Sequence, residues 1–134
     1  MNKQQAINAF WSGFGVLAFE ESTVPDDKTI EALIKAGAAP SKYPYITYQV
    51  LTSDIDNAVM PTASIWDKSS SWEKVDLLAN RIAETIANMT PTALDNGRMY
   101  ITTGTPFSQH MSEEGDSSIR RNVLTVQIEF LTSY

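Results

Sequence analysis

Apolar residues recur along this chain at two spacings, one typical of helices and one typical of strands. In residues 7–14 and 71–89 they return every three or four positions, as expected for helices with one buried side. The apolar positions are Ile7, Phe10, Trp11 and Phe14 in the first segment, and Val75, Leu78, Ile82, Ile86 and Met89 in the second. A shorter helix is predicted over residues 27–36, with Gly37 and Pro40 as stop signals.

The start of the longest predicted helix carries a capping signal. Ser70 and Glu73 stand three residues apart, the spacing at which a hydroxyl and a carboxylate satisfy free N–H groups of the first turn. The sequence therefore predicts a capping box at this position.

Four segments predict strands. Residues 45–52 and 58–66 are rich in β-branched and aromatic types, and residues 98–103 follow the turn signal Asn96-Gly97. Pro61 predicts an edge strand or a bulge, because proline cannot donate to the ladder of a sheet. The last strand has the clearest alternation of apolar and polar residues, with these apolar positions: Leu124, Val126, Ile128 and Phe130.

The order of these elements predicts the fold class. Strands in adjacent pairs favour antiparallel hairpins, so we expect a single α+β domain over residues 1–134. The expected architecture is two-layered, with an antiparallel four-stranded sheet and helices packed on one face. The polar, acidic residues 104–118 predict a long loop between the last two strands.

Charge and composition narrow the classes of function. The 134 residues carry a formal net charge of −6 and no cysteine. A net negative charge argues against sequence-independent binding to nucleic-acid phosphates and against binding to anionic membranes. The absence of cysteine excludes disulfides and thiolate chemistry and suits a reducing cytoplasm. No segment approaches the roughly 20 apolar residues of a membrane span.

A search for catalytic and ligand-binding motifs gives only weak matches. Gly13 and Gly15 fit a loose dinucleotide fingerprint, but they follow a helical pattern instead of a strand. Asp54 and Asp56 resemble the start of a calcium loop that lacks its glycine and its final glutamate. His110, the single histidine, has no partner visible in the sequence. The sequence therefore predicts a protein that is not an enzyme and has no metal or other cofactor.

Two aromatic segments resemble a known family. "FWSGFGVLAFEESTVPDD" at residues 10–27, followed by "YPYITYQV" at residues 43–50, resembles the start of tail terminator (tail completion) proteins of long-tailed bacteriophages and prophages. The later stretches "SIWDKSSSWEKVDLLANRIAETI" and "IRRNVLTVQIEFLT" fit the rest of that pattern, so the resemblance covers nearly the whole chain. Two departures are Phe19, where tyrosine is expected, and the longer connection at residues 28–42.

The resemblance implies a structural, minor capsid-type protein of the virion tail or neck, made in the host cytoplasm. Members of the family form a six-subunit ring that caps the tail tube, ends its polymerisation and joins it to the head. The implied partners are further copies of the chain, the tail tube protein and the head–tail connector protein. DNA would pass through the ring without specific binding, and no membrane is involved. Two alternatives stay open: a neighbouring head–tail connector protein, and a small cytoplasmic ligand-binding or enzymatic α+β domain.

Two groups of residues are the candidate subunit or partner contacts. The first group consists of aromatic residues at the first strand: Tyr43, Tyr45 and Tyr48. The second group lies in the expected loop and consists of Phe107, Gln109, His110 and Met111, with Glu113, Glu114 and Asp116 facing a basic patch or the ring lumen. Trp66 and Trp72 are expected to serve as core or interface anchors.

Overall fold

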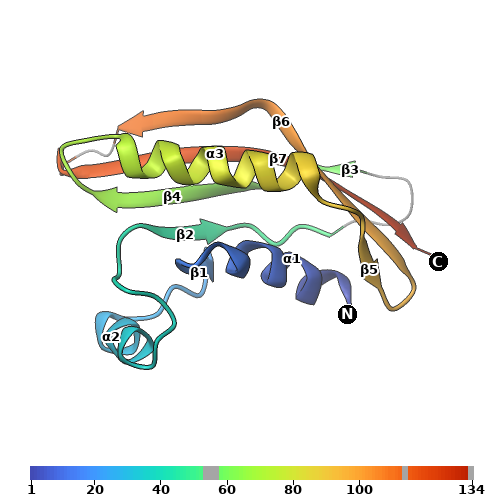
Figure 1. Ribbon diagram of the computed structural model, residues 1–134, viewed down its shortest axis with the longest axis horizontal. Coiled ribbons are helices and arrows are strands. Elements are labelled where there is room, and N and C mark those ends of the chain that lie inside the picture. Colours follow the sequence, from blue (N-terminus) through green and yellow to red (C-terminus); the bar gives the residue numbers. More distant parts are fainter. Residues whose placement is uncertain (53–57, 113–114, 133–134) are drawn as a thin grey trace.

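One mixed sheet runs through the computed structural model, which describes residues 1–52, 58–112 and 115–132 (Figure 1). Its strand order is β1-β2-β4-β7-β6-β5, with β3 paired to β7, and the sheet curls strongly into a half-barrel. The strands are β1 (Leu17–Glu20), β2 (Tyr45–Tyr48), β3 (Ala58–Val59), β4 (Thr62–Lys68), β5 (Thr92–Leu94), β6 (Gly97–Ser112) and β7 (Ile119–Thr132). The helices are α1 (Lys3–Trp11), α2 (Asp27–Lys35) and α3 (Glu73–Asn88), and a 3-10 turn, η1 (Ser12–Phe14), follows α1.

The two faces of the sheet have different coverings. Residues that alternate along β2, β4 and β7 point their apolar side chains to α1 and α3, where Trp11, Ile82 and Phe130 are almost fully buried. We call this side the helix face. The opposite side carries α2 at the β1 end, through a small cluster of Leu17, Ile30 and Ala39. Beyond α2, no helix of the described residues packs on this second side, which we call the open face.

The predicted four-stranded antiparallel sheet with helices on one face is wrong, although the α+β class holds. The described residues form seven strands, β1 runs parallel to β2, and α2 lies on the face opposite α1 and α3. The missed strands, β1 and β5, have only four and three residues, too few to show a periodic pattern. The chain from β1 through α2 to β2 is a crossover, which is the connection that parallel strands require.

The predicted long loop over residues 104–118 is also wrong for most of its length. Strand β6 continues to Ser112 and pairs with β7 along two stretches, separated by a register shift between Thr103 and Ser108. Pro106 lies within this shift, where no ladder donor is needed. The segment is polar because much of it is solvent-exposed, not because it leaves the sheet.

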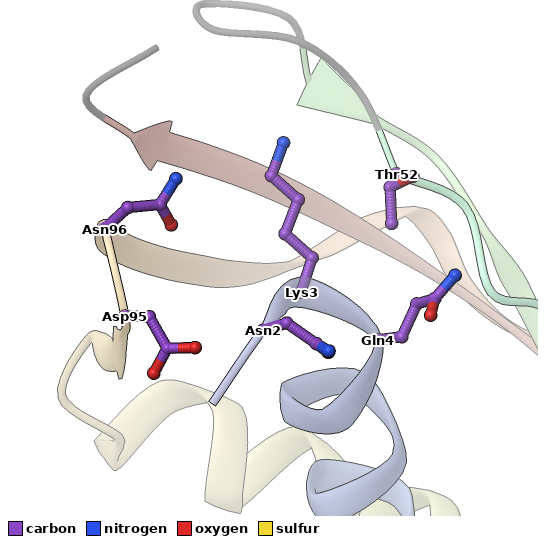
Figure 2. A pocket seen from close by; sticks show the side chains of 6 residues that line it. All are labelled: Asn2, Lys3, Gln4, Thr52, Asp95 and Asn96. Atoms are coloured by element: carbon purple, nitrogen blue, oxygen red, sulfur yellow. The ribbon is translucent and has the colours of Figure 1, made fainter.

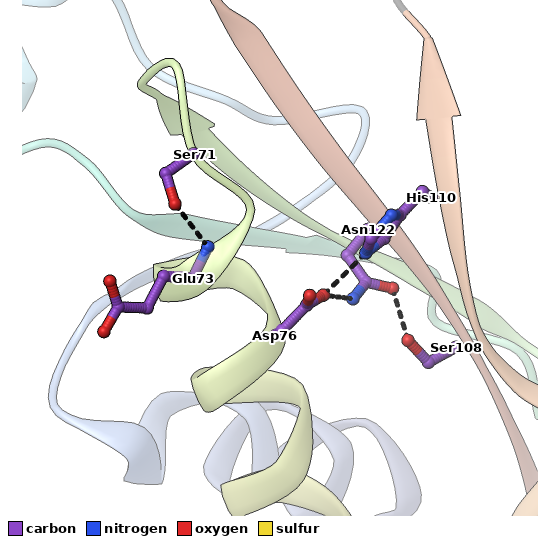
Figure 3. A network of polar contacts seen from close by, with 6 residues as sticks. All are labelled: Ser71, Glu73, Asp76, Ser108, His110 and Asn122. Carbon is purple, nitrogen blue, oxygen red and sulfur yellow. Dashed lines mark hydrogen bonds and ion pairs between the residues drawn. The ribbon is translucent and has the colours of Figure 1, made fainter.

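The predicted capping box at the start of α3 is absent from the described contacts. The N-cap residue is Trp72, which provides no side-chain cap, and Glu73 N–H donates to Ser71 Oγ at 3.1 Å (Figure 3). Pro61 lies between β4 and β3, and β3 pairs with β7 alone among the described strands, as an edge strand does. β3 and β4 pair with β7 in one unshifted register, so the proline separates them without a bulge.

Candidate interaction surfaces

A row of four side chains crosses the open face from strand to strand. Tyr45 of β2 is the register partner of Trp66 of β4, which in turn faces Arg121 of β7, and Arg121 faces Met111 of β6. Register partners on adjacent strands point to the same side of a sheet, so the four side chains lie side by side. We call Tyr45, Trp66, Arg121 and Met111 the aromatic row.

Contacts within the open face hold the aromatic row in a fixed geometry. The Tyr45 and Trp66 rings stack at a centroid distance of 6.3 Å, and the Arg121 guanidinium lies 4.7 Å from the centroid of the Trp66 ring. Trp66 Nε1 donates to Thr47 Oγ1 at 2.9 Å, and Arg121 Nε donates to Ser64 Oγ at 3.0 Å. Ordered side chains lose little rotamer entropy when a partner binds, so the row is pre-organised for a contact.

Contacts between a cation and aromatic rings also occur past Tyr45, in the loop that follows α2. Lys42 Nζ lies 5.1 Å from the Tyr43 ring centroid and 5.9 Å from that of Tyr45, and it donates to Asp27 Oδ1 at 3.2 Å. Tyr43 also contacts Tyr45 at 5.5 Å between ring centroids. Within this chain, Lys42 therefore contacts aromatic rings and a carboxylate of α2 at the same time.

Ionisation of two tyrosines is expected to make the fold sensitive to alkali. Burial raises the pKa of Tyr45 and of Tyr48 above the ordinary 10.0, with smaller contributions from Tyr43 and Glu20 respectively. The unfolded chain loses these phenolic protons first. The free energy of unfolding is therefore constant for these groups below about pH 10 and falls as the pH rises through the folded-state pKa values. Urea unfolding at pH values from about 9 to about 12 measures this loss. A phenolate absorbance titration in which all five tyrosines ionise together at the ordinary pKa would contradict it.

A second cluster joins the end of β6 to the start of α3 on the helix face (Figure 3). His110 Nε2 lies 2.7 Å from Asp76 Oδ1, and the imidazole stacks on the Trp72 ring at a centroid distance of 3.7 Å. Asn122, fully buried on β7, donates from Nδ2 to Asp76 Oδ1 at 3.1 Å and accepts from Ser108 Oγ at 2.8 Å. We call Asp76, Ser108, His110 and Asn122 the polar clasp.

The polar clasp fastens strands to a helix and does not form an acyl-transfer triad. Ser108 donates to Asn122, while the imidazole of His110 contacts Asp76 and covers Trp72. A triad requires the hydroxyl to be hydrogen-bonded to the imidazole. Among the described residues, no group of three His, Asp or Glu side chains is placed to hold a metal ion.

A hollow lies at the opposite end of the molecule, beside the start of α1 (Figure 2). It has a volume of about 350 Å³, and its lining side chains are all polar or charged: Asn2, Lys3, Gln4, Thr52, Asp95 and Asn96. The N-terminal ammonium group donates to Asp95 Oδ1 at 2.7 Å at its rim. Small-molecule sites are mostly apolar with a few polar groups, so this hollow does not resemble one.

The structure separates the candidate contact residues predicted from the sequence. Tyr45, Gln109 and Met111 lie on the open face, and Tyr43 is at its margin. Tyr48 is buried in the core, stacked on Trp11 at 6.0 Å with its hydroxyl donating to Asn8 Oδ1.

Of the remaining predicted residues, those that the structure describes lie at or near the hairpin end. Phe107 packs against the main core, and His110 belongs to the polar clasp. Asp116 accepts hydrogen bonds from the Ser118 side chain and backbone, which lower the pKa of its carboxyl. Glu113 and Glu114 lie outside the described residues.

Sequence reasoning missed Arg121 and Asn122 as site residues. Both interrupt the apolar alternation at the start of the last strand, where "IRRN" precedes "VLTVQIEF", and this interruption was the available signal.

No protein-family model matches the chain, and no curated protein shows significant sequence similarity to it. Within the described ranges, no helix has both the length and the apolar character of a membrane span.

Proposed function

We propose that this chain is a non-catalytic assembly subunit that forms a closed ring of identical copies. The observation that carries the proposal is the aromatic row. Tyrosine, tryptophan, arginine and methionine are the residue types most enriched at the centres of protein interfaces. Here they stand together on a sheet face that no helix of the described residues covers beyond α2.

Within that class, we propose that the ring caps a phage tail tube, ends its polymerisation and contacts the head connector. Support for this role comes from the resemblance of residues 10–27 and 43–50 to tail terminator proteins. The net charge of −6 also suits a ring through which DNA passes without binding. Such a ring needs two different surfaces on each subunit, because each copy meets the next head to tail.

Tube assembly in the presence of this chain tests the capping role. The tail tube protein of the same phage or prophage is polymerised with and without the purified chain, and tube lengths are measured by negative-stain electron microscopy. We expect shorter tubes with a ring at one end when the chain is present. Tubes of unchanged length without end rings would contradict the capping role.

A further inference from the structure

We infer that the aromatic row binds a second copy of this chain. The acidic segment of that second copy, Glu20–Glu31, docks on the row. This inference rests on the proposed ring, because it names the two surfaces that meet between neighbouring subunits. The segment covers the end of β1 and the first half of α2.

Charge complementarity selects these two surfaces. Strand residues on the open face include three cations, Lys68, Arg98 and Arg121, but among the described residues only one carboxylate, Glu129. The described strand residues of this face therefore carry a net charge of +2, on a chain whose total is −6. The acidic segment carries five carboxylates and one lysine, a net charge of −4: Glu20, Glu21, Asp26, Asp27, Glu31 and Lys28. A surface and a segment of opposite sign on one chain favour self-association over repulsion.

The positions of the two surfaces favour a head-to-tail contact. The acidic segment is at the β1 end of the sheet, and Arg121 and Met111 stand on β7 and β6, three and four strands away in the sheet order (Figure 1). Because the donor and acceptor surfaces differ, each added copy leaves one of each exposed, until the ring closes. A two-fold dimer would instead use the same surface twice.

The contact proposed between subunits repeats one that exists within each subunit. Asp27 of α2 accepts from Lys42, which lies on the rings of Tyr43 and Tyr45. At the other end of the row, Arg121 lies on the Trp66 ring in the same way. Exposed carboxylates of the incoming segment, Glu21 and Glu31 among them, meet this second cation-on-ring site.

Cross-linking tests the predicted proximity. The chain has no cysteine, so introduced thiols are unique. A Met111→Cys chain is mixed with a differently tagged Glu31→Cys chain, and a flexible bismaleimide is added. Leu77→Cys replaces Met111→Cys in the control, because Leu77 is 56% exposed on α3 while Met111 is 43% exposed. We expect mixed-tag dimers at least about tenfold more abundant with Met111→Cys than with Leu77→Cys. Equal yields would overturn the inference.

A charge variant gives a second readout that does not depend on cross-linker reach. Met111→Asp places a carboxylate in the aromatic row and should weaken self-association at least about tenfold in sedimentation velocity, whereas Leu77→Asp should not. Adding Glu31→Lys to Met111→Asp should restore part of the loss. Unchanged association of Met111→Asp would overturn the inference.

The outcomes separate this inference from the proposed function. Closed rings that assemble without the Met111–Glu31 cross-link would overturn the interface and leave the ring intact. Cross-linked filaments without closed rings would support the interface and overturn the ring.

Discussion

Replacing Trp11 by alanine is expected to lower the free energy of unfolding by about 3–5 kcal/mol. The side chain is 1% exposed at the end of α1 and joins this helix to the sheet through its stack with Tyr48. Its ring also contacts Phe10 edge to face at 4.9 Å. Truncation removes a large buried surface and leaves a cavity that the neighbouring strands fill only in part. Urea unfolding followed by far-ultraviolet circular dichroism measures the loss.

Trp66→Ala is the matched control for Trp11→Ala. Trp66 is only partly buried and lies on the open face, so its removal exposes neighbours to water without leaving an enclosed cavity. We expect a smaller loss of stability than for Trp11→Ala. A Trp11→Ala loss equal to or below that of Trp66→Ala would show that the core is not where the structure places it.

Asn122→Asp is expected to destabilise the fold by about 3–5 kcal/mol at neutral pH. The amide is fully buried, and its Nδ2 donates to Asp76 Oδ1 at 3.1 Å. The nearly isosteric change replaces this donor by an oxygen, so two carboxylates face each other beside His110. Ser108 can still donate to the new side chain. The loss of stability therefore measures the effect of the added negative charge.

The effect of Asn122→Asp should depend on pH with a definite sign. Burial and the charge of Asp76 disfavour ionisation in the folded state, so the new carboxyl keeps its proton there to a higher pH than in the unfolded chain. The deficit is absent below about pH 4 and grows as the pH rises. Gln127→Glu makes the same chemical change on the open side of β7 and should cost far less. Equal losses for the two variants at neutral pH would contradict the assigned burial.

The elements predicted correctly are those whose signal is local and repeated. Helix α3 has five apolar positions at helical spacing, and β7 alternates over four apolar residues, so both were visible in the sequence. The missed features lack such a signal. The parallel pair of β1 and β2 joins segments far apart along the chain, β5 has only three residues, and the extension of β6 to Ser112 is mostly exposed and has no apolar alternation.

The candidate contact surface was predicted only in part for the same reason. Tyr45 was predicted as an aromatic contact and Met111 as a contact in the expected loop, but their alignment with Trp66 and Arg121 exists only through the register of four strands. The sequence predicts His110 as a contact residue of a loop, with no partner visible. Its contacts with Trp72 and Asp76 require the end of β6 to lie beside the start of α3, which no local pattern indicates.

Native mass spectrometry of the full chain over a wide concentration range tests most directly the claim that this is a ring-forming subunit. We predict one dominant assembly with a single, fixed subunit number, six if the resemblance to tail terminators holds, which does not grow further as concentration rises. Negative-stain images of the same sample should show closed rings. A chain that stays monomeric throughout, or that adds copies without limit, would contradict the account.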